Sequence, residues 1–226
     1  MNYLSIEQEA RSVQMAIWKA RRARSIKTRD QLLELFTPQS AAEVLGIRYE
    51  FINRLANFGG SVSGLELAGL FDRQAGKIVI SDRFSPEIQK YTGAHEIGHM
   101  TMHTELVMHR DRPIGGLDFE SPARSLQERE ADYFAACFLM PRKIVTEAFE
   151  DNFGQLPFVF DEETAFWLSP RDFGSLLRPR EDSLDRELAL ASTTRFKGNR
   201  VEPLCKQFRV SSKTMAIRIK ELGLVA

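Results

Sequence analysis

The run His95-Glu96-Ile97-Gly98-His99 combines two potential metal ligands with an acid. In an α-helix, residues four positions apart lie on the same face, so His95 and His99 can direct both imidazoles at one ion. Glu96 follows the first histidine directly, where its carboxylate can accept a proton from water at that ion and pass it to a leaving amine. With only 4 histidines in the chain, random placement predicts about 0.006 such runs. The pattern therefore predicts two zinc ligands and one general base.

A catalytic zinc ion needs a third protein ligand and keeps its fourth position for water. The remaining histidines are poor candidates for this ligand. His103 stands two turns beyond His95 on the same helix, about 12 Å along the axis, which is too far to share the ion easily. His109 is expected in or near a loop, as an exposed polar residue.

The predicted helix over residues 126–139 offers carboxylates instead. Its apolar residues define one face, and at about 100° per residue Glu128 lies within the arc of that face, whereas Glu130 lies at its edge. An acid on an apolar face is costly unless it is paired or bound to a metal. Glu128 is therefore predicted as the third ligand, with Glu130 as the alternative. Asp132, one turn beyond Glu128, is placed to hydrogen-bond a ligand imidazole.

The helix that carries the two histidines is predicted to begin at Ser85-Pro86-Glu87 and to end at about His103. Serine can cap a helix, proline suits the first turn, and an acid is favourable near the positive end. Before this helix, a glycine-containing turn over residues 72–76 separates two strand-like runs, Leu67–Phe71 and Lys77–Ser81. The pattern predicts a β-hairpin directly before the histidine helix.

The rest of the chain is expected to be mainly helical. Further helices are predicted over residues 5–24, 30–36 and 38–45, loops over 57–64 and 112–125, an irregular helical stretch over 142–192, and two short helices around Val210-Ser211. These elements predict an α+β fold that is mostly helical, with a small antiparallel sheet.

The composition of the 226 residues, 43% hydrophobic and 27% charged, is that of a soluble globular protein. Lysine plus arginine (31) equals aspartate plus glutamate (31), so the overall charge indicates no polyanionic partner. Two cysteines far apart in sequence fit a reducing compartment. No run resembles a signal peptide or approaches the roughly 18 apolar residues of a membrane span. A cytoplasmic location without a membrane partner is therefore expected.

Residues 91–99, with His103 four positions on, resemble the signature T-x-A-H-E-x-G-H-x-x-x-H of the ImmA/IrrE family of zinc metallopeptidases. Residues 128–141 are similar to that family's block E-x-x-A-(D/N)-x-F-A-A-x-x-L-M-P. The predicted hairpin lies where the family has its strands, so the resemblance covers about residues 65–141 strongly. Residues 204–225 are similar to a helix-turn-helix-like block that is also found in the family.

The resemblance implies a zincin-like fold, a Zn²⁺ cofactor and zinc metalloendopeptidase activity of the gluzincin-like HExxH type. Residue by residue, the family's ligands fall on His95, His99 and Glu128, and its catalytic glutamate falls on Glu96. Members of the family cleave helix-turn-helix transcriptional repressors, often encoded beside them, and so switch on stress, mobile-element or phage genes. A protein substrate of this kind is therefore expected.

The resemblance also suggests a division of the chain. A metallopeptidase domain is expected over residues 1–192, with its core at 65–141 and a helical extension at 142–192 that is longer than the family norm. A helix-turn-helix-like segment is expected over residues 193–226.

Three further residues are expected near the site. His103 would either hydrogen-bond a ligand or form part of the cleft wall. Tyr91, four positions before the first ligand, could assist at an oxyanion or simply pack. The strand Lys77–Ser81, with Val79 at its centre, could offer an edge against which an extended substrate pairs.

The C-terminal segment supports a competing interpretation, in which the chain is a DNA- or repressor-binding regulator, or a toxin–antitoxin component, on a peptidase scaffold. Residues 195–226 hold eight Lys/Arg against two acids. An apolar core in this segment would leave its lysines and arginines outward. The core would consist of Leu204, Phe208, Val210, Met215, Ile219 and Leu222. The presence of His95, Glu96 and His99 together favours the enzyme, since a pure scaffold has no physical need for Glu96.

Overall fold

The computed structural model describes residues 2–21, 26–53, 67–104, 109–111 and 125–226, with only the backbone described for 109–111. The chain forms two compact units, Met1–Leu139 and Met140–Ala226. The predicted class, α+β and mostly helical, is confirmed. The loop predicted over 57–64 lies outside the described residues, as does that predicted over 112–125 except for its last residue. The predicted domain boundary after residue 192 stays a prediction.

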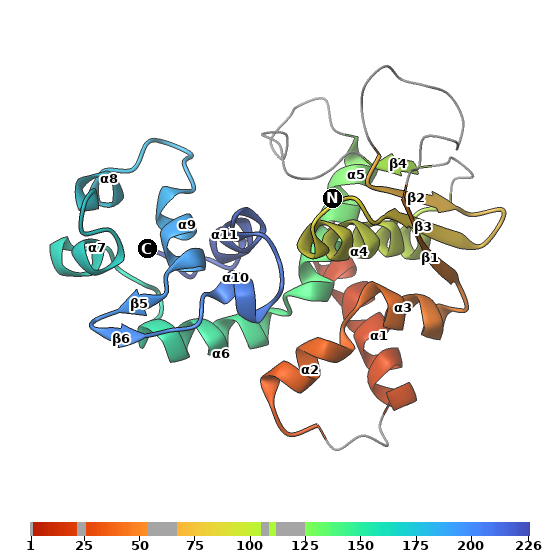
Figure 1. The fold of residues 1–226 in the computed structure, drawn as a ribbon, viewed down its shortest axis with the longest axis horizontal. Coiled ribbons are helices and arrows are strands. Elements are labelled where there is room, and N and C mark those ends of the chain that lie inside the picture. Colours follow the sequence, from red (N-terminus) through yellow and green to blue (C-terminus); the bar gives the residue numbers. More distant parts are fainter. Residues whose placement is uncertain (1, 22–25, 54–66, 105–108, 112–124) are drawn as a thin grey trace. The chain divides into compact units, whose positions relative to one another are not determined.

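The sheet of the first unit has the strand order β1-β3-β2-β4 (Figure 1). Its strands are β1 (Arg48–Ile52), β2 (Gly69–Asp72), β3 (Lys77–Ser81) and β4 (His109–Asp111). The predicted hairpin is the antiparallel pair of β2 and β3, and β4 adds an antiparallel neighbour to β2. The strand β1, which the sequence did not predict, runs parallel to β3. The sheet is therefore mixed, not purely antiparallel.

The strand β3 lies inside the sheet, between β1 and β2. Val79 is aligned with Glu50 on one side and Leu70 on the other, and it is 1% exposed. Because both edges of β3 are already hydrogen-bonded, the prediction that Lys77–Ser81 offers a free edge to substrate is wrong. Val79 is a core residue that packs with Leu70.

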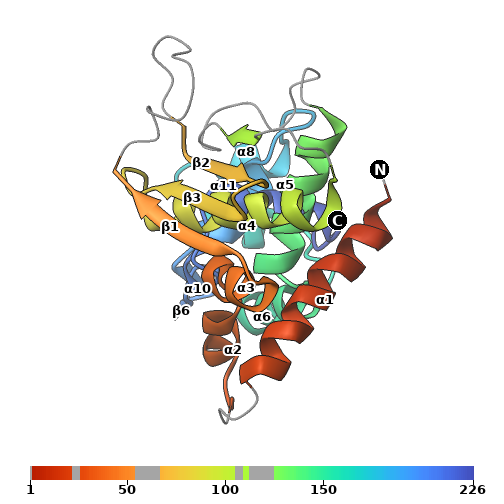
Figure 2. The ribbon, with the colours of Figure 1, turned by 90° about the vertical axis from the view of Figure 1, so that its right-hand side faces the viewer.

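Helices complete the described part of the first unit (Figure 2). They are α1 (Tyr3–Arg21), α2 (Arg29–Leu35), α3 (Pro38–Leu45), α4 (Pro86–Met102) and α5 (Leu126–Leu139). The helix α4 packs on β2 and β3 and against α5, while α1 packs against α5 and α3. A Cβ at Gly98 would lie 3.2 Å from the Cα atom of Ala131, so the glycine allows the backbones of α4 and α5 to approach closely.

Both ends of α4 are defined by identifiable residues. Pro86 opens the helix as predicted, but the side chain of Ser85 makes no capping hydrogen bond. At the other end, the Arg73 guanidinium donates to the carbonyl oxygens of His99 (3.1 Å) and Met100 (3.3 Å), and also to that of His103. These bonds add to the hydrogen bonding of the carbonyls at the helix end, where the His99 carbonyl also accepts from the His103 N–H at 3.2 Å. The turn between β2 and β3 therefore fixes the end of the histidine helix.

The second unit is mainly helical. It contains α6 (Arg142–Phe153), α7 (Glu162–Leu168), α8 (Phe173–Leu177), α9 (Asp185–Ser192), the short strands β5 (Arg195–Phe196) and β6 (Asn199–Arg200), α10 (Leu204–Gln207) and α11 (Ser212–Glu221). The two helices predicted around Val210-Ser211 are α10 and α11. All six apolar residues predicted as their core are buried.

One basic residue of α11 differs from the expectation that its cations face outward. Arg218 is 1% exposed. Its Nε donates to the carbonyl oxygen of Met140 at 3.1 Å, and its Nη1 lies 3.0 Å from a carboxylate oxygen of Glu221. Arg218 is thus a structural residue of the second unit. Within the described ranges, no helix is both long and apolar enough to span a bilayer.

Candidate metal centre

Three side chains, two from α4 and one from α5, meet at one point. His95 and His99 lie one turn apart on α4, both fully buried, and their Nε2 atoms are 2.9 Å apart. The Glu128 carboxylate, at the first turn of α5, places one oxygen 3.3 Å from His95 Nε2 and the other 3.3 Å from His99 Nε2. The close packing of α4 on α5 brings these atoms together. The sequence offered two candidates for the third ligand, Glu128 and, as the alternative, Glu130. The structure places Glu128 with the two imidazoles.

The chemistry and spacing of these three groups fit a zinc ion. Their donor atoms all lie within 4.8 Å of one another. Ligand atoms about 2.0–2.1 Å from a tetrahedral zinc ion are separated by about 3.4 Å, close to the distances found here. Two imidazole nitrogens and one carboxylate oxygen are a known donor set of catalytic zinc sites. In the part of the chain that the structure describes, no other three-residue group meets this distance criterion.

The electrostatics keep the third group in the ionised form that metal binding requires. Burial by itself would raise the pKa of Glu128, but hydrogen bonds and charge interactions with His95 and His99 outweigh burial. They hold the pKa of Glu128 well below its ordinary value. The side chain of Glu128 is 25% exposed, whereas both imidazoles are fully buried.

Each imidazole is held from behind at its Nδ1 atom. Asp132 Oδ1 lies 2.9 Å from His95 Nδ1, and His103 Nδ1 lies 3.0 Å from His99 Nδ1. Glu130 Oε2 in turn lies 3.2 Å from His103 Nε2. Such partners fix the ring orientation and leave Nε2 toward the centre. Asp132 and His103 thus lie where their predicted supporting roles require, and Glu130 pairs with His103.

The predicted base, Glu96, is fully buried on α4 and directs its carboxylate toward β2. A Cβ at Gly69 would lie 3.2 Å from Glu96 Oε1 and 2.4 Å from Thr92 Cγ2. Only glycine leaves room for both side chains at this point of the strand. The sequence reasoning missed Gly69, although a glycine inside a strand is a recognised sign of close approach.

Tyr91 connects the two helices of the centre. The hydroxyl of Tyr91 donates to the main-chain carbonyl of Asp132 at 3.0 Å, which links α4 to α5. This contact supports the packing role, one of the two roles considered for Tyr91. The side chain of His109 lies outside the described part of the structure.

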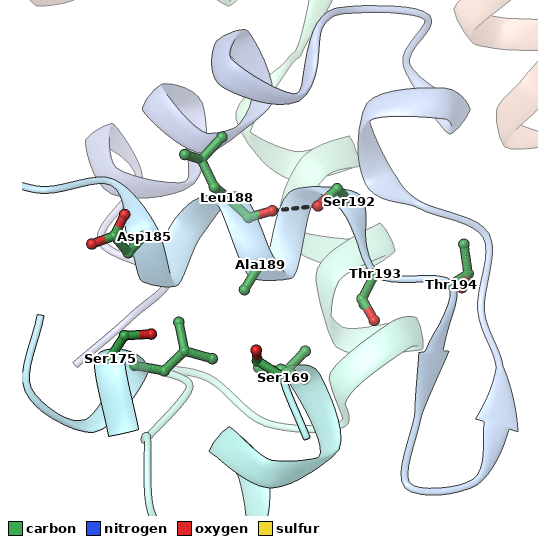
Figure 3. A pocket seen from close by; sticks show the side chains of 10 residues that line it. Ser169, Ser175, Asp185, Leu188, Ala189, Ser192, Thr193 and Thr194 are labelled. Atoms are coloured by element: carbon green, nitrogen blue, oxygen red, sulfur yellow. Dashed lines mark hydrogen bonds between the residues drawn. The ribbon is translucent and has the colours of Figure 1, made fainter. Parts of the chain in front are cut away.

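The second unit contains a cavity of its own, about 500 Å³ in volume (Figure 3). Its wall is formed by α7, α8 and α9 and is rich in serine and threonine. The hydroxyl of Ser192, for example, donates to the Leu188 carbonyl at 2.6 Å. None of the residues predicted for the metal centre lines this cavity.

The fold and the centre together are those of a metallopeptidase-like domain, and a comparison with protein families agrees. Residues 64–156 match the model of the M78 peptidase family, described as the IrrE N-terminal-like domain. The resemblance to the ImmA/IrrE family predicted from the motifs is confirmed over these residues. A comparison with curated proteins returned no match to this chain. A peptidase family implies a protein substrate, and the three-residue centre suggests a bound metal.

Proposed function

We propose that this chain is a zinc-dependent endopeptidase. The observation that carries the proposal is the triangle of His95 Nε2, His99 Nε2 and a Glu128 carboxylate, with the acid Glu96 on the same helix. The match to a peptidase family supports the same role. A cytoplasmic location is part of the proposal, and it is supported by Cys137 and Cys205, which are both free and buried.

In this proposal the side chains divide the work. His95, His99 and Glu128 would hold the ion, which when bound polarises a peptide carbonyl and makes water a stronger nucleophile at neutral pH. Glu96 accepts the proton of the attacking water and returns it to the leaving amine. Asp132 and His103 keep the two imidazoles in the required orientation.

We propose a helix-turn-helix transcriptional repressor as the substrate, and derepression of stress or mobile-element genes as the outcome. The support is the match of residues 64–156 to the IrrE N-terminal-like domain, together with the resemblance to a family whose members cleave such repressors. An extended substrate would need a strand edge, and the edge strands of the described sheet are β1 and β4.

The test combines metal analysis with a cleavage assay against the repressor encoded nearest to this gene, using wild type and Glu96→Gln. We expect wild type to bind zinc and cleave. Glu96→Gln should bind the same amount of zinc and cleave at least about a hundredfold more slowly, the lower end of a general base's usual contribution. A chelator should abolish cleavage by wild type, and added zinc should restore it. Cleavage by zinc-loaded Glu96→Gln at the wild-type rate would remove Glu96 as the base.

The alternative function, a DNA- or repressor-binding regulator or toxin–antitoxin component, rests on the basic C-terminal segment. Five residues of α11 are buried, Arg218 among them, which narrows the surface that a recognition helix could present. A DNA reader would lose affinity steeply with added salt, because phosphate contacts release counterions. Zinc-dependent repressor cleavage without salt-sensitive DNA binding would support the enzyme, and the opposite result would support the regulator.

A further inference from the structure

A tyrosine from outside the matched family segment lies against the helix that carries the base. Tyr49, on β1, directs its hydroxyl onto α4, where a Cβ at Gly93 would lie 2.1 Å from that oxygen. The same hypothetical Cβ would lie 2.9 Å from Pro38 Cβ, so the hydroxyl is enclosed between α3 and α4. Any side chain at position 93 would displace Tyr49. The glycine therefore holds open the place that the hydroxyl occupies.

This place is polar as well as buried. Within the described ranges, Tyr49 Oη and Thr92 Oγ1 are both buried without a hydrogen-bond partner. Such groups are costly in a protein interior, and an orphaned hydroxyl beside a candidate site calls for a functional explanation. Glu96 stands one turn beyond Thr92 and three residues beyond Gly93, which puts all three on the same side of α4.

The Tyr49 hydroxyl is suited to donate. Burial and, second, the negative charge of Glu96 raise the pKa of Tyr49 far above its ordinary value, so the phenol keeps its proton. This influence of Glu96 agrees with the position of the hydroxyl over Gly93, three residues before Glu96 on α4. Hydrogen bonds of catalytic groups are often long in a free enzyme and shorten when the site is loaded.

We propose that Tyr49 is a positioning residue for the base: its hydroxyl supplies the hydrogen bond that holds the Glu96 carboxylate in place during proton transfer. This inference rests on the proposed peptidase function. It assigns a role to β1, a strand outside the residues 64–156 that match the family.

The first test is kinetic and compares Tyr49→Phe with Tyr133→Phe. Both variants lose one phenolic hydroxyl, but that of Tyr133 lies 2.6 Å from a Glu7 carboxylate oxygen, between α5 and α1. We expect Tyr49→Phe to lower kcat about tenfold, as for loss of a hydrogen bond to a charged group. KM, zinc content and thermal stability should stay near wild type. Tyr133→Phe should keep the wild-type kcat.

The second test does not depend on activity. The chain has 4 tyrosines, so a protein labelled with ¹³C at tyrosine Cζ gives a small set of signals that the phenylalanine variants assign. We expect the Tyr49 signal to shift in Glu96→Gln, while the Tyr133 signal stays unchanged. An unshifted Tyr49 signal would overturn the proposed contact.

The two tests separate the possible failures. If wild type cleaves nothing while the Tyr49 signal still responds to Glu96→Gln, the proposed peptidase function fails and the contact stands. If wild type cleaves and Tyr49→Phe keeps its kcat, the positioning role is overturned. Loss of zinc or of folding in Tyr49→Phe would also overturn it in favour of a purely structural role.

Discussion

The donor atoms of the candidate centre are oriented by residues that would not themselves touch the ion. His95 is held by Asp132 and His99 by His103, each through Nδ1, so both Nε2 atoms face the same point. Glu128 completes the triangle because its two oxygens reach the two rings separately.

Replacing Glu128 by alanine should lower zinc content more than replacing Glu130, because Glu128 lies with the ligand nitrogens and Glu130 lies at His103. Metal analysis of the two purified variants measures this difference. If Glu130→Ala lost more zinc than Glu128→Ala, the third ligand would have to be reassigned.

Asp132→Ala should weaken zinc binding about 10–100-fold, since it frees the His95 ring to rotate and makes it less basic. A competition titration with a chromophoric chelator measures the affinity. Asp82→Ala, which removes an exposed carboxylate near the end of β3, is the control and should leave the affinity unchanged. Equal effects of the two substitutions would contradict the supporting role of Asp132.

At the scale of elements, the centre depends on how closely α5 approaches α4. Gly98, next to His99 on α4, faces Ala131 and Phe134 of α5. The distance between the two helix backbones there sets whether a carboxylate of α5 reaches the imidazoles. Arg73 holds the same helix at its C-terminal end. The ligand spacing is therefore a property of the packing of these elements.

Gly98→Ala should lower the free energy of unfolding by about 1–3 kcal/mol through overpacking, because its Cβ would lie 3.1 Å from Phe134 Cδ1 and 3.2 Å from Ala131 Cα. It should also reduce zinc affinity by moving α5 outward. Gly174 in α8 is the matched control, since a Cβ there would meet nothing within 4 Å. Gly174→Ala should be neutral or stabilise by up to about 1 kcal/mol. Urea unfolding of both variants checks the prediction, and equal midpoints would refute it.

At the scale of the whole chain, the two compact units provide separate optical probes. The chain has 2 tryptophans, Trp18 in the first unit and Trp167 in the second. All the candidate ligands belong to the first unit. An ion that binds the folded state and not the unfolded state stabilises the unit that holds it against unfolding.

Zinc at about 100 times its dissociation constant should therefore stabilise the unit reported by Trp18 by about 2.7 kcal/mol. The transition reported by Trp167 should not move. Denaturation of Trp167→Phe and Trp18→Phe, each with a single tryptophan, measures the two transitions with and without zinc. Glu128→Ala is the control, and zinc should shift its Trp18 transition less than that of the protein with the wild-type residue. Equal shifts at both probes would mean that the units unfold together.

Much of the site could be predicted because its strongest signals are local. The spacing of His95 and His99 follows from the helical repeat, and the bounds predicted for α5 are those of the structure. The hairpin before α4 could be predicted because a glycine turn and β-branched residues act within a few positions. These features depend on backbone geometry and short-range preferences, which a sequence displays directly.

The remaining features required residues far apart in the chain to meet. The strand β1 closes one edge of β3, which removed the substrate edge expected at Val79. Glu130 finds His103, Arg218 is buried under the Met140 carbonyl, and Tyr49 reaches the helix of Glu96. The sequence by itself determined the types of the candidate ligands and the helix that carries Glu96. Only the tertiary structure decided which acid joins the imidazoles, because packing of separate elements sets distances that no local pattern encodes.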